Sequence, residues 1–105
     1  MAKPNLTFPT GLVLQAISQG ARYGFDIIGA TGLPSGTVYQ ALRRLEGTDC
    51  LASEWEDQEE VEGRPPRCYY TLTPEGQALL EKAVRRFPAI RMSIGGEGAL
   101  EPGRA

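Results

Sequence analysis

Residues 35–45 read SGTVYQALRRL, and this stretch has the pattern of an amphipathic helix. Its apolar side chains Val38, Leu42 and Leu45 recur at intervals of four and three residues, so they share one stripe. Ser35 is the expected N-cap, and hydroxyl, amide and guanidinium groups occupy the other positions. A helix of this size fits a DNA major groove about 12 Å wide. A purely solvated face carrying Arg43 and Arg44 is the plainer interpretation of the same pattern.

Two shorter apolar segments precede this stretch. A first helix is predicted over residues 10–19, capped by Thr10 and followed by Gly20. A second helix over residues 23–30 is expected to end at Gly32 and to bury three side chains, Phe25, Ile27 and Ile28. The turn Leu33-Pro34 then leads into the amphipathic segment, which gives the layout of a helix-turn-helix.

A β-hairpin is predicted to follow. Residues 51–56 and 67–72 alternate in polarity and are expected to form antiparallel strands. Residues 63–67, the wing loop, read GRPPR and hold two arginines and no acid, whereas residues 54–62 hold six acids and no base. A stiff basic loop beside a surface helix suits a phosphate backbone. The acids at 56–62 would repel that backbone unless the loop carries them away from it.

A last helix is predicted from Thr73-Pro74, which supply a cap and a first-turn proline. Its apolar residues continue to position 94 and exceed what a three-helix core can cover, which favours a helix from a second subunit as partner. Packing against the first helix alone is the alternative. Pro88 should kink or split the helix. The residues expected at a dimer interface are Leu80, Val84, Phe87, Ile90 and Ile94.

The 105 residues suit one domain, expected over 1–94 with the last helix at about 74–94, and the glycine-rich residues 95–105 should form a disordered tail. The fold class expected is mainly α with a small β-hairpin. The net charge is -2, yet outside residues 54–62 the chain holds 11 basic and 7 acidic residues, so contact with DNA is compatible with the total. Neither a membrane span nor a secretory signal is visible, which predicts a cytoplasmic protein.

The sequence offers few residues that could form a metal site or a catalytic site. Histidine is absent, and Cys50 and Cys68 would lie too far apart along the hairpin for a disulfide, so free thiols and no metal or other cofactor are expected. The chain also lacks a glycine-rich phosphate loop and a pair of acids placed in an apolar pocket. We therefore expect a protein that is not an enzyme.

Four motifs in the same order carry a family resemblance: LQAISQGARYGFDI at 14–27, GTVYQALRRLE at 36–46, GRP at 63–65 and YYTLTPEG at 69–76. The resemblance that they carry extends over about residues 12–87. In these motifs the chain resembles the PadR family of bacterial transcriptional regulators, of the short type without a large C-terminal domain.

The resemblance implies a winged helix-turn-helix fold with a C-terminal dimerisation helix, and a homodimer that represses transcription at a palindromic operator. It carries the groove-reading role to Gly36, Thr37 and Tyr39, and the wing role to Arg64, with Arg67 close by. It also implies a small aromatic or drug-like effector. The chain departs from the family where Pro34 precedes Ser35, where Gly47-Thr48-Asp49 could end the helix early, and where Gln40 replaces a common proline.

The resulting site prediction divides DNA contacts into two kinds. Phosphates are expected at Ser35, Tyr39, Arg64 and Arg67, and base edges at Thr37, Gln40 and Arg43. An effector site lined by Trp55, Phe87 and Met92 is a weaker expectation, because core packing explains each of them as well. The alternative function is a winged-helix protein-interaction module that uses the acidic stretch 54–62 as a docking surface.

Overall fold

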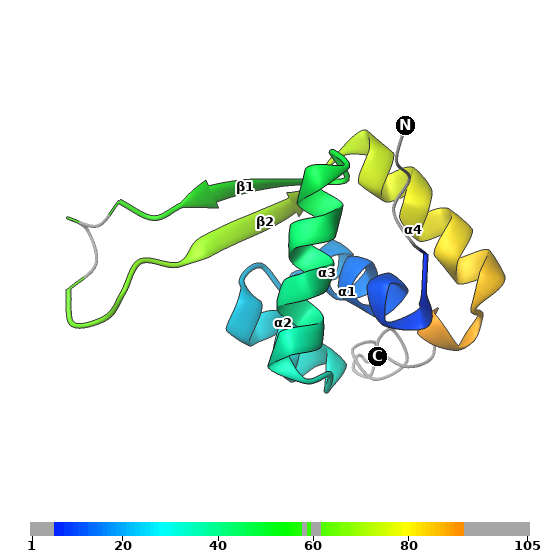
Figure 1. Cartoon of the computed structure of the whole chain (residues 1–105), viewed down its shortest axis with the longest axis horizontal. Coiled ribbons are helices and arrows are strands. Elements are labelled where there is room, and N and C mark those ends of the chain that lie inside the picture. Colours follow the sequence, from blue (N-terminus) through cyan, green and yellow to red (C-terminus); the bar gives the residue numbers. More distant parts are fainter. Residues whose placement is uncertain (1–5, 58, 60–61, 92–105) are drawn as a thin grey trace, which may run out of the picture.

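The computed structural model describes residues 6–57, 59 and 62–91 of the chain, and these form four helices and one two-stranded antiparallel sheet (Figure 1). The helices form a body from which the hairpin extends to one side. The expected tail at 95–105, and Ile94 with it, lies outside the described residues. The elements in chain order are α1 (Phe8–Ser18), α2 (Gly24–Thr31), α3 (Ser35–Gly47), β1 (Leu51–Trp55), β2 (Cys68–Leu72) and α4 (Pro74–Arg86).

Helix α1 lies at the centre of the body, because residues 11–17 are all buried and α2, α3 and α4 pack around them. Gly11 lets the chain after α4 approach closely: a methyl group there would overlap Cδ1 of Ile90 and lie 3.2 Å from Cβ of Ala83. The core is apolar and continuous. Its largest fully buried apolar side chains are Val13, Leu14, Ile27, Val38, Leu42, Leu45 and Ile90.

Three predictions about α1 to α3 need correction. Helix α1 begins two residues earlier than expected, because Thr7 rather than Thr10 caps it and Pro9 occupies the first turn. Helix α3 begins with Ser35 already helical and Pro34 as its cap residue, so Ser35 does not cap it. Phe25, expected in the core, is 77% exposed on α2, while Ile27 is buried as predicted. The glycine stop of α2 is confirmed: Gly32 has a left-handed φ of 74°.

Helix α4 confirms the predicted cap and the predicted break. Thr73 accepts a hydrogen bond from the backbone N–H of Gly76, and Pro74 stands at the start of the helix. The helix ends at Arg86, just before Pro88, so it does not run on without interruption toward residue 94. Ile90, beyond the break, folds back into the core.

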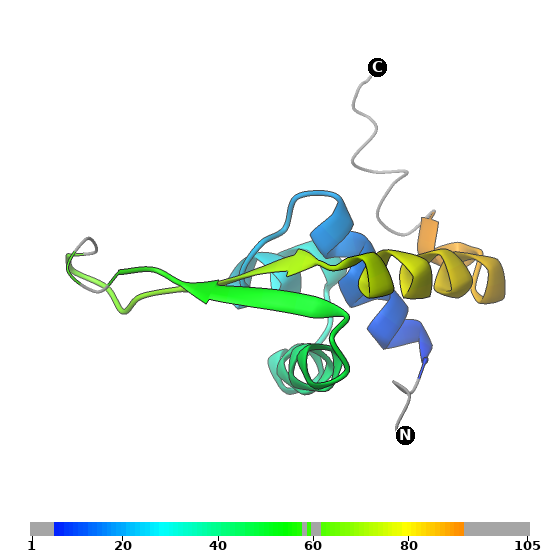
Figure 2. The ribbon, with the colours of Figure 1, turned by 90° about the horizontal axis from the view of Figure 1, so that it is seen from above.

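The hairpin has the register Leu51↔Leu72 through Trp55↔Cys68. Its base is tied to the helical body by a hydrogen bond of 2.7 Å from the N–H of Tyr70 to the carbonyl of Arg22, and by a bridge between Tyr23 and Tyr69. Seen from above, the hairpin projects past α2 and α3 (Figure 2). Both cysteines are free, as predicted.

Within the described part of the chain, no helix is long and apolar enough to cross a membrane. Residues 6–57, 59 and 62–91 also contain no cluster of three or more side chains able to hold a metal ion.

Candidate nucleic-acid interface

The outer face of α3 presents polar side chains in rows along the helix. The stripe of Val38, Leu42 and Leu45 is fully buried, which fixes the rotation of the helix about its axis. Thr37, on the flank, is half-buried. The exposed residues of this helix include Ser35, Gly36, Tyr39, Gln40, Arg43 and Arg44. All DNA contacts predicted on α3, except that of the half-buried Thr37, therefore fall on exposed residues, and the contacts themselves stay a prediction.

Tyr39 is held in place by a glycine of the neighbouring helix. Tyr39 is 45% exposed, and its ring rests on the first residue of α2, Gly24. A methyl group at Gly24 would lie 2.6 Å from both Cε1 and Cζ of Tyr39, far inside van der Waals contact. Because Gly24 has no side chain, the phenol of Tyr39 can pack directly against the start of α2.

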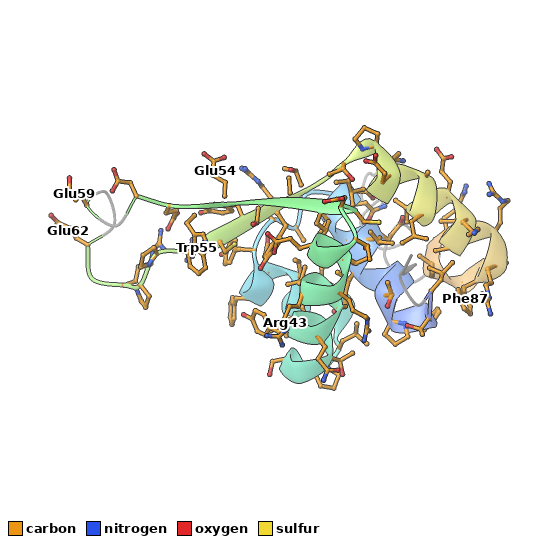
Figure 3. The ribbon with its side chains drawn as sticks, turned by 45° about the horizontal axis from the view of Figure 1, so that its top comes forward. Arg43, Glu54, Trp55, Glu59, Glu62 and Phe87 are labelled. Atoms are coloured by element: carbon orange, nitrogen blue, oxygen red, sulfur yellow. The ribbon has the colours of Figure 1, made fainter. Side chains whose placement is uncertain are left out.

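The acids of the hairpin are directed away from α3. Ser53 donates a hydrogen bond to Glu46 of α3, and Trp55 shares its face of the strand, so that face is turned toward the helix. Glu54 lies on the other side of the hairpin, and Glu59 and Glu62 lie at its far end (Figure 3). The expected repulsion between these acids and a duplex on α3 is thereby reduced by distance.

One acid behaves differently, and sequence reasoning missed it. Glu56 forms an ion pair of 2.8 Å with Arg64 and also accepts hydrogen bonds from the backbone N–H of Arg67 and the hydroxyl of Tyr69. These contacts, that of Arg64 above all, lower the pKa of Glu56 from 4.5 to about 2. The same carboxylate raises the pKa of Arg64. The wing loop is thus less cationic than its two arginines suggested.

Arg67 lies against the helical body. Its guanidinium stacks 4.2 Å from the ring centre of Tyr23, and Tyr23 meets the ring of Tyr69 edge-on at 5.6 Å. Arg22 covers Tyr69, 4.9 Å from its ring centre. This stack of cations and aromatic rings fixes the base of the wing loop beside α2.

A cleft of about 520 Å³ separates the hairpin from α2 and α3. Trp55, 66% exposed, and Phe25 stand on its walls, and Tyr39 joins it from α3. Arg64 and Arg67 of the wing loop line it as well. The structure therefore brings Tyr39, Arg64 and Arg67 to one cleft, whereas Gln40, Arg43 and Arg44 lie together elsewhere on α3.

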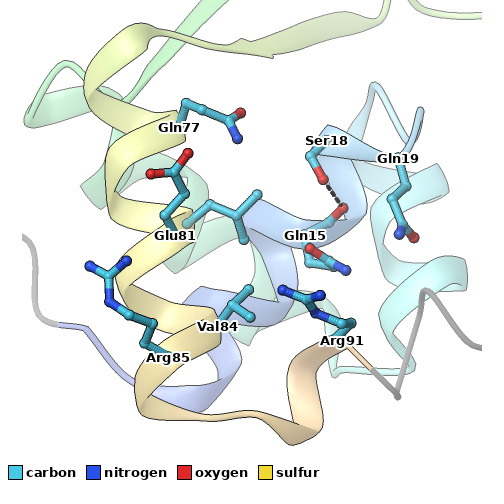
Figure 4. Close-up of a pocket in the computed structure, with 9 residues that line it drawn as sticks. Gln15, Ser18, Gln19, Gln77, Glu81, Val84, Arg85 and Arg91 are labelled. Carbon is cyan, nitrogen blue, oxygen red and sulfur yellow. Dashed lines mark hydrogen bonds between the residues drawn. The ribbon is translucent and has the colours of Figure 1, made fainter.

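A second cavity of about 520 Å³ lies between α1 and α4 (Figure 4). Of the residues predicted at a dimer interface, Leu80 and Val84 line this cavity. Val84 is half-buried, and Phe87 is half-buried against Phe8, with ring centres 5.9 Å apart. Leu80 and Ile90 are buried inside their own subunit, so their side chains offer little surface to a second copy. The dimer interface stays a prediction.

The predicted effector site does not form from its described members. Trp55 lines the cleft beside the hairpin, whereas Phe87 lies at the opposite end of the molecule (Figure 3). Met92 lies outside the described residues. Trp55 and Phe87 therefore do not share a pocket.

Comparisons with known proteins agree on one family. The model of the transcriptional regulator PadR-like family matches residues 13–82. A PadR family transcription regulator from Clostridium difficile R20291 is 26% identical, with a TM-score of 0.67 over 87% of this chain and 98% of its own. A PadR-like transcription factor from Bacteroides fragilis is 25% identical, with a TM-score of 0.64 over 84% of this chain and 87% of its own.

A third solved structure concerns regulation by a small molecule. It is BpsR of Bordetella bronchiseptica, whose DNA binding is described as regulated by 6-hydroxynicotinic acid. BpsR is 28% identical, with a TM-score of 0.65 over 89% of this chain and 67% of its own. No curated protein matches the chain by sequence.

Proposed function

Because the chain belongs to the PadR-like family of transcriptional regulators, we propose that it binds double-stranded DNA through α3 and the wing loop. One observation carries this proposal: the exposed polar face of α3 lies beside an extended hairpin whose wing loop shares a cleft with Tyr39. A helix and a loop arranged in this way can contact a groove and the neighbouring phosphates together.

Contacts to base edges and contacts to phosphates are made by different residues of this surface. Gln40 and Arg43, exposed on α3, meet base edges in the major groove, and Thr37 contributes from the flank. Ser35 and Tyr39 contact phosphates from α3. Arg64 and Arg67 contact the backbone from the wing loop, in a geometry limited by their bonds to Glu56 and Tyr23.

The assembly we propose is a homodimer on a palindromic operator, acting as a repressor. Two copies of α3 about 34 Å apart would enter successive major grooves on one face of the duplex. The half-buried apolar residues Val84 and Phe87 near the end of α4 support an interface there.

We also propose that a small molecule regulates DNA binding. The regulation described for BpsR supports this idea, and the cavity between α1 and α4 offers a place for such a molecule (Figure 4). Arg85 and Arg91 line it together with Glu81, so the lining carries more positive than negative charge and suits an anionic ligand.

The experiment that tests DNA binding is selection from a random duplex library, followed by titration of the retained sequence. Arg43→Ala should weaken binding to that sequence by about 1–3 kcal/mol and relax the preference at one base pair. Lys82→Ala, which removes one positive charge from the exposed face of α4, serves as control and should change affinity less than about twofold. A chain that retains no duplex at low salt would contradict the proposal and favour the protein-interaction module.

A further inference from the structure

The carboxylate of Glu56 occupies an unusual position for a protein that approaches DNA, because it is bonded to both arginines of the wing loop. We propose that Glu56 is a specificity-determining residue, which restrains Arg64 so that this cation contributes little to binding of arbitrary DNA and is held for a single docking geometry. This inference rests on the proposed DNA binding.

Every acceptor position of the carboxylate is used. Oε1 accepts from Nη1 of Arg64 at 2.8 Å and from the backbone N–H of Arg67 at 3.0 Å. Oε2 accepts from Nη2 of Arg64 at 3.1 Å and from the hydroxyl of Tyr69 at 2.7 Å. The backbone N–H of Glu56 donates in turn to the carbonyl of Arg67 at 2.9 Å. Glu56 therefore joins the two arms of the hairpin just beyond the last strand pair.

The ion pair of Glu56 and Arg64 has no net charge near physiological pH. The pKa of Glu56 falls to about 2, first because of Arg64 and then because of Tyr69 and Arg67, so the carboxylate stays charged. A cation already paired with a carboxylate attracts a phosphate less and releases fewer counterions from DNA than a free one. Arg64 should therefore add little to sequence-independent affinity.

One edge of the Arg64 guanidinium nevertheless remains open to a DNA phosphate. Of its five N–H groups, two donate to Glu56 and one to the carbonyl of Pro65, which leaves two without a partner among the described residues. The side chain of Arg64 is 35% exposed. Because Glu56 fixes the plane of the guanidinium, only a phosphate that arrives on the open edge in the right orientation forms good hydrogen bonds. Correctly docked DNA meets that condition, and DNA bound at random seldom does.

Glu54 provides a matched control for the test. It precedes Glu56 by two residues, so both point to the same face of the strand, and its exposed carboxylate forms no hydrogen bond or ion pair with any described residue. Glu54→Gln and Glu56→Gln change the net charge equally, and only the second releases Arg64. Binding to a duplex of arbitrary sequence is measured by fluorescence anisotropy across a range of salt concentrations, and folding is checked by circular dichroism.

Glu56→Gln should raise affinity for arbitrary DNA by about five- to tenfold at low salt and make the slope of log K against log salt steeper by about 0.9, the value for one more phosphate contact. The ratio of affinities for the selected operator and for arbitrary DNA should fall. Glu54→Gln should change the slope by less than about 0.3. Equal effects of the two variants, or weaker binding by Glu56→Gln, would show that Glu56 only braces the loop and would overturn the inference.

A second measurement compares the substitution of Arg64 in the natural chain and in the Glu56→Gln background. Arg64→Ala in the otherwise natural chain should reduce the salt slope by less than about half a unit, and in the Glu56→Gln background by about 0.9. A reduction near 0.9 in the natural chain overturns the inference. Failure of the natural chain to bind any duplex would instead defeat the proposed function, so the two failures are distinguishable.

Discussion

The place of Tyr39 on the surface of α3 depends on the missing side chain at Gly24. The two residues lie far apart in the chain, yet the phenol ring occupies the space that a methyl group at Gly24 would fill. Sequence reasoning identified Tyr39 through its helix and could not assign Gly24 a role, because the contact exists only once α2 and α3 have packed.

We expect Gly24→Ala to displace the ring of Tyr39 and weaken DNA binding several-fold, because tilting the phenol would move its hydroxyl away from the phosphate that we propose it contacts. The measurement is the dissociation constant for the selected operator, together with the midpoint of thermal unfolding. Gly29→Ala in the same helix is the control, since a methyl group there meets no atom within 4 Å and should leave binding unchanged. If both variants bind like the natural chain, Gly24 does not position Tyr39.

Some contacts of single residues could not be predicted from the sequence pattern. Arginines at positions 64 and 67 were visible as a basic loop, but their partners Glu56 and Tyr23 depend on how the loop folds back on the strands. Phe25 was expected in the core because it is apolar at helical spacing, and it faces a cleft instead.

At the scale of elements, the junction between β2 and α4 is held by Thr73. Its hydroxyl accepts from the N–H of Gly76 at 3.0 Å and donates to the carbonyl of Asp49 at 2.6 Å, so it caps α4 and also ties it to the turn between α3 and β1. Gly76 packs so closely on the carbonyl of Cys50 that a methyl group would overlap it. Thr73 thus connects β2, α4 and the turn after α3.

Thr73→Ala should lower the free energy of unfolding by about 1–2 kcal/mol, the cost of losing an N-cap. Chemical denaturation followed by circular dichroism measures this loss. Thr73→Ser keeps the hydroxyl and should retain most of the stability. A serine variant as unstable as the alanine variant would mean that the methyl group, rather than the cap, matters.

Element types and most boundaries were predictable, because apolar periodicity and caps are local signals. The stripe of Val38, Leu42 and Leu45, the Gly32 stop and the break at Pro88 are examples. The start of α1 was not, because Thr7 and Thr10 both offer a hydroxyl and the choice depends on Pro9 between them.

At the scale of the whole molecule, the charges are separated along the hairpin. Glu54 lies on the side of the hairpin turned away from α3, and Glu59 and Glu62 lie at its far end, whereas Arg43 lies on α3 (Figure 3). The overall charge of -2 therefore says little about the surface that we propose for DNA binding. The sequence could reveal the clustering of acids at 54–62 but not the side of the hairpin on which Glu54 lies.

The proposed homodimer is a property of the whole molecule, and a substitution on α4 tests it. Val84→Glu places a charge on the half-buried surface of α4 and should shift the protein from dimer toward monomer in sedimentation experiments, because burying an unpaired carboxylate in an interface is costly. It should also weaken binding to a two-half-site operator more than to a single half-site.

Ala78→Glu is the control, as Ala78 is exposed on the same helix and does not line the cavity between α1 and α4. It should sediment like the natural chain. A natural chain that remains monomeric at all concentrations would contradict the dimer, whatever the variants do.

Trp55 is the only tryptophan in the sequence, and it stands two-thirds exposed in the cleft between the hairpin and α3. Nearly all ultraviolet emission excited at the red edge of the absorption band must therefore originate from this one position. Its wavelength maximum and quenching by iodide become a label-free gauge of whether anything has entered the cleft, read directly from the unmodified protein.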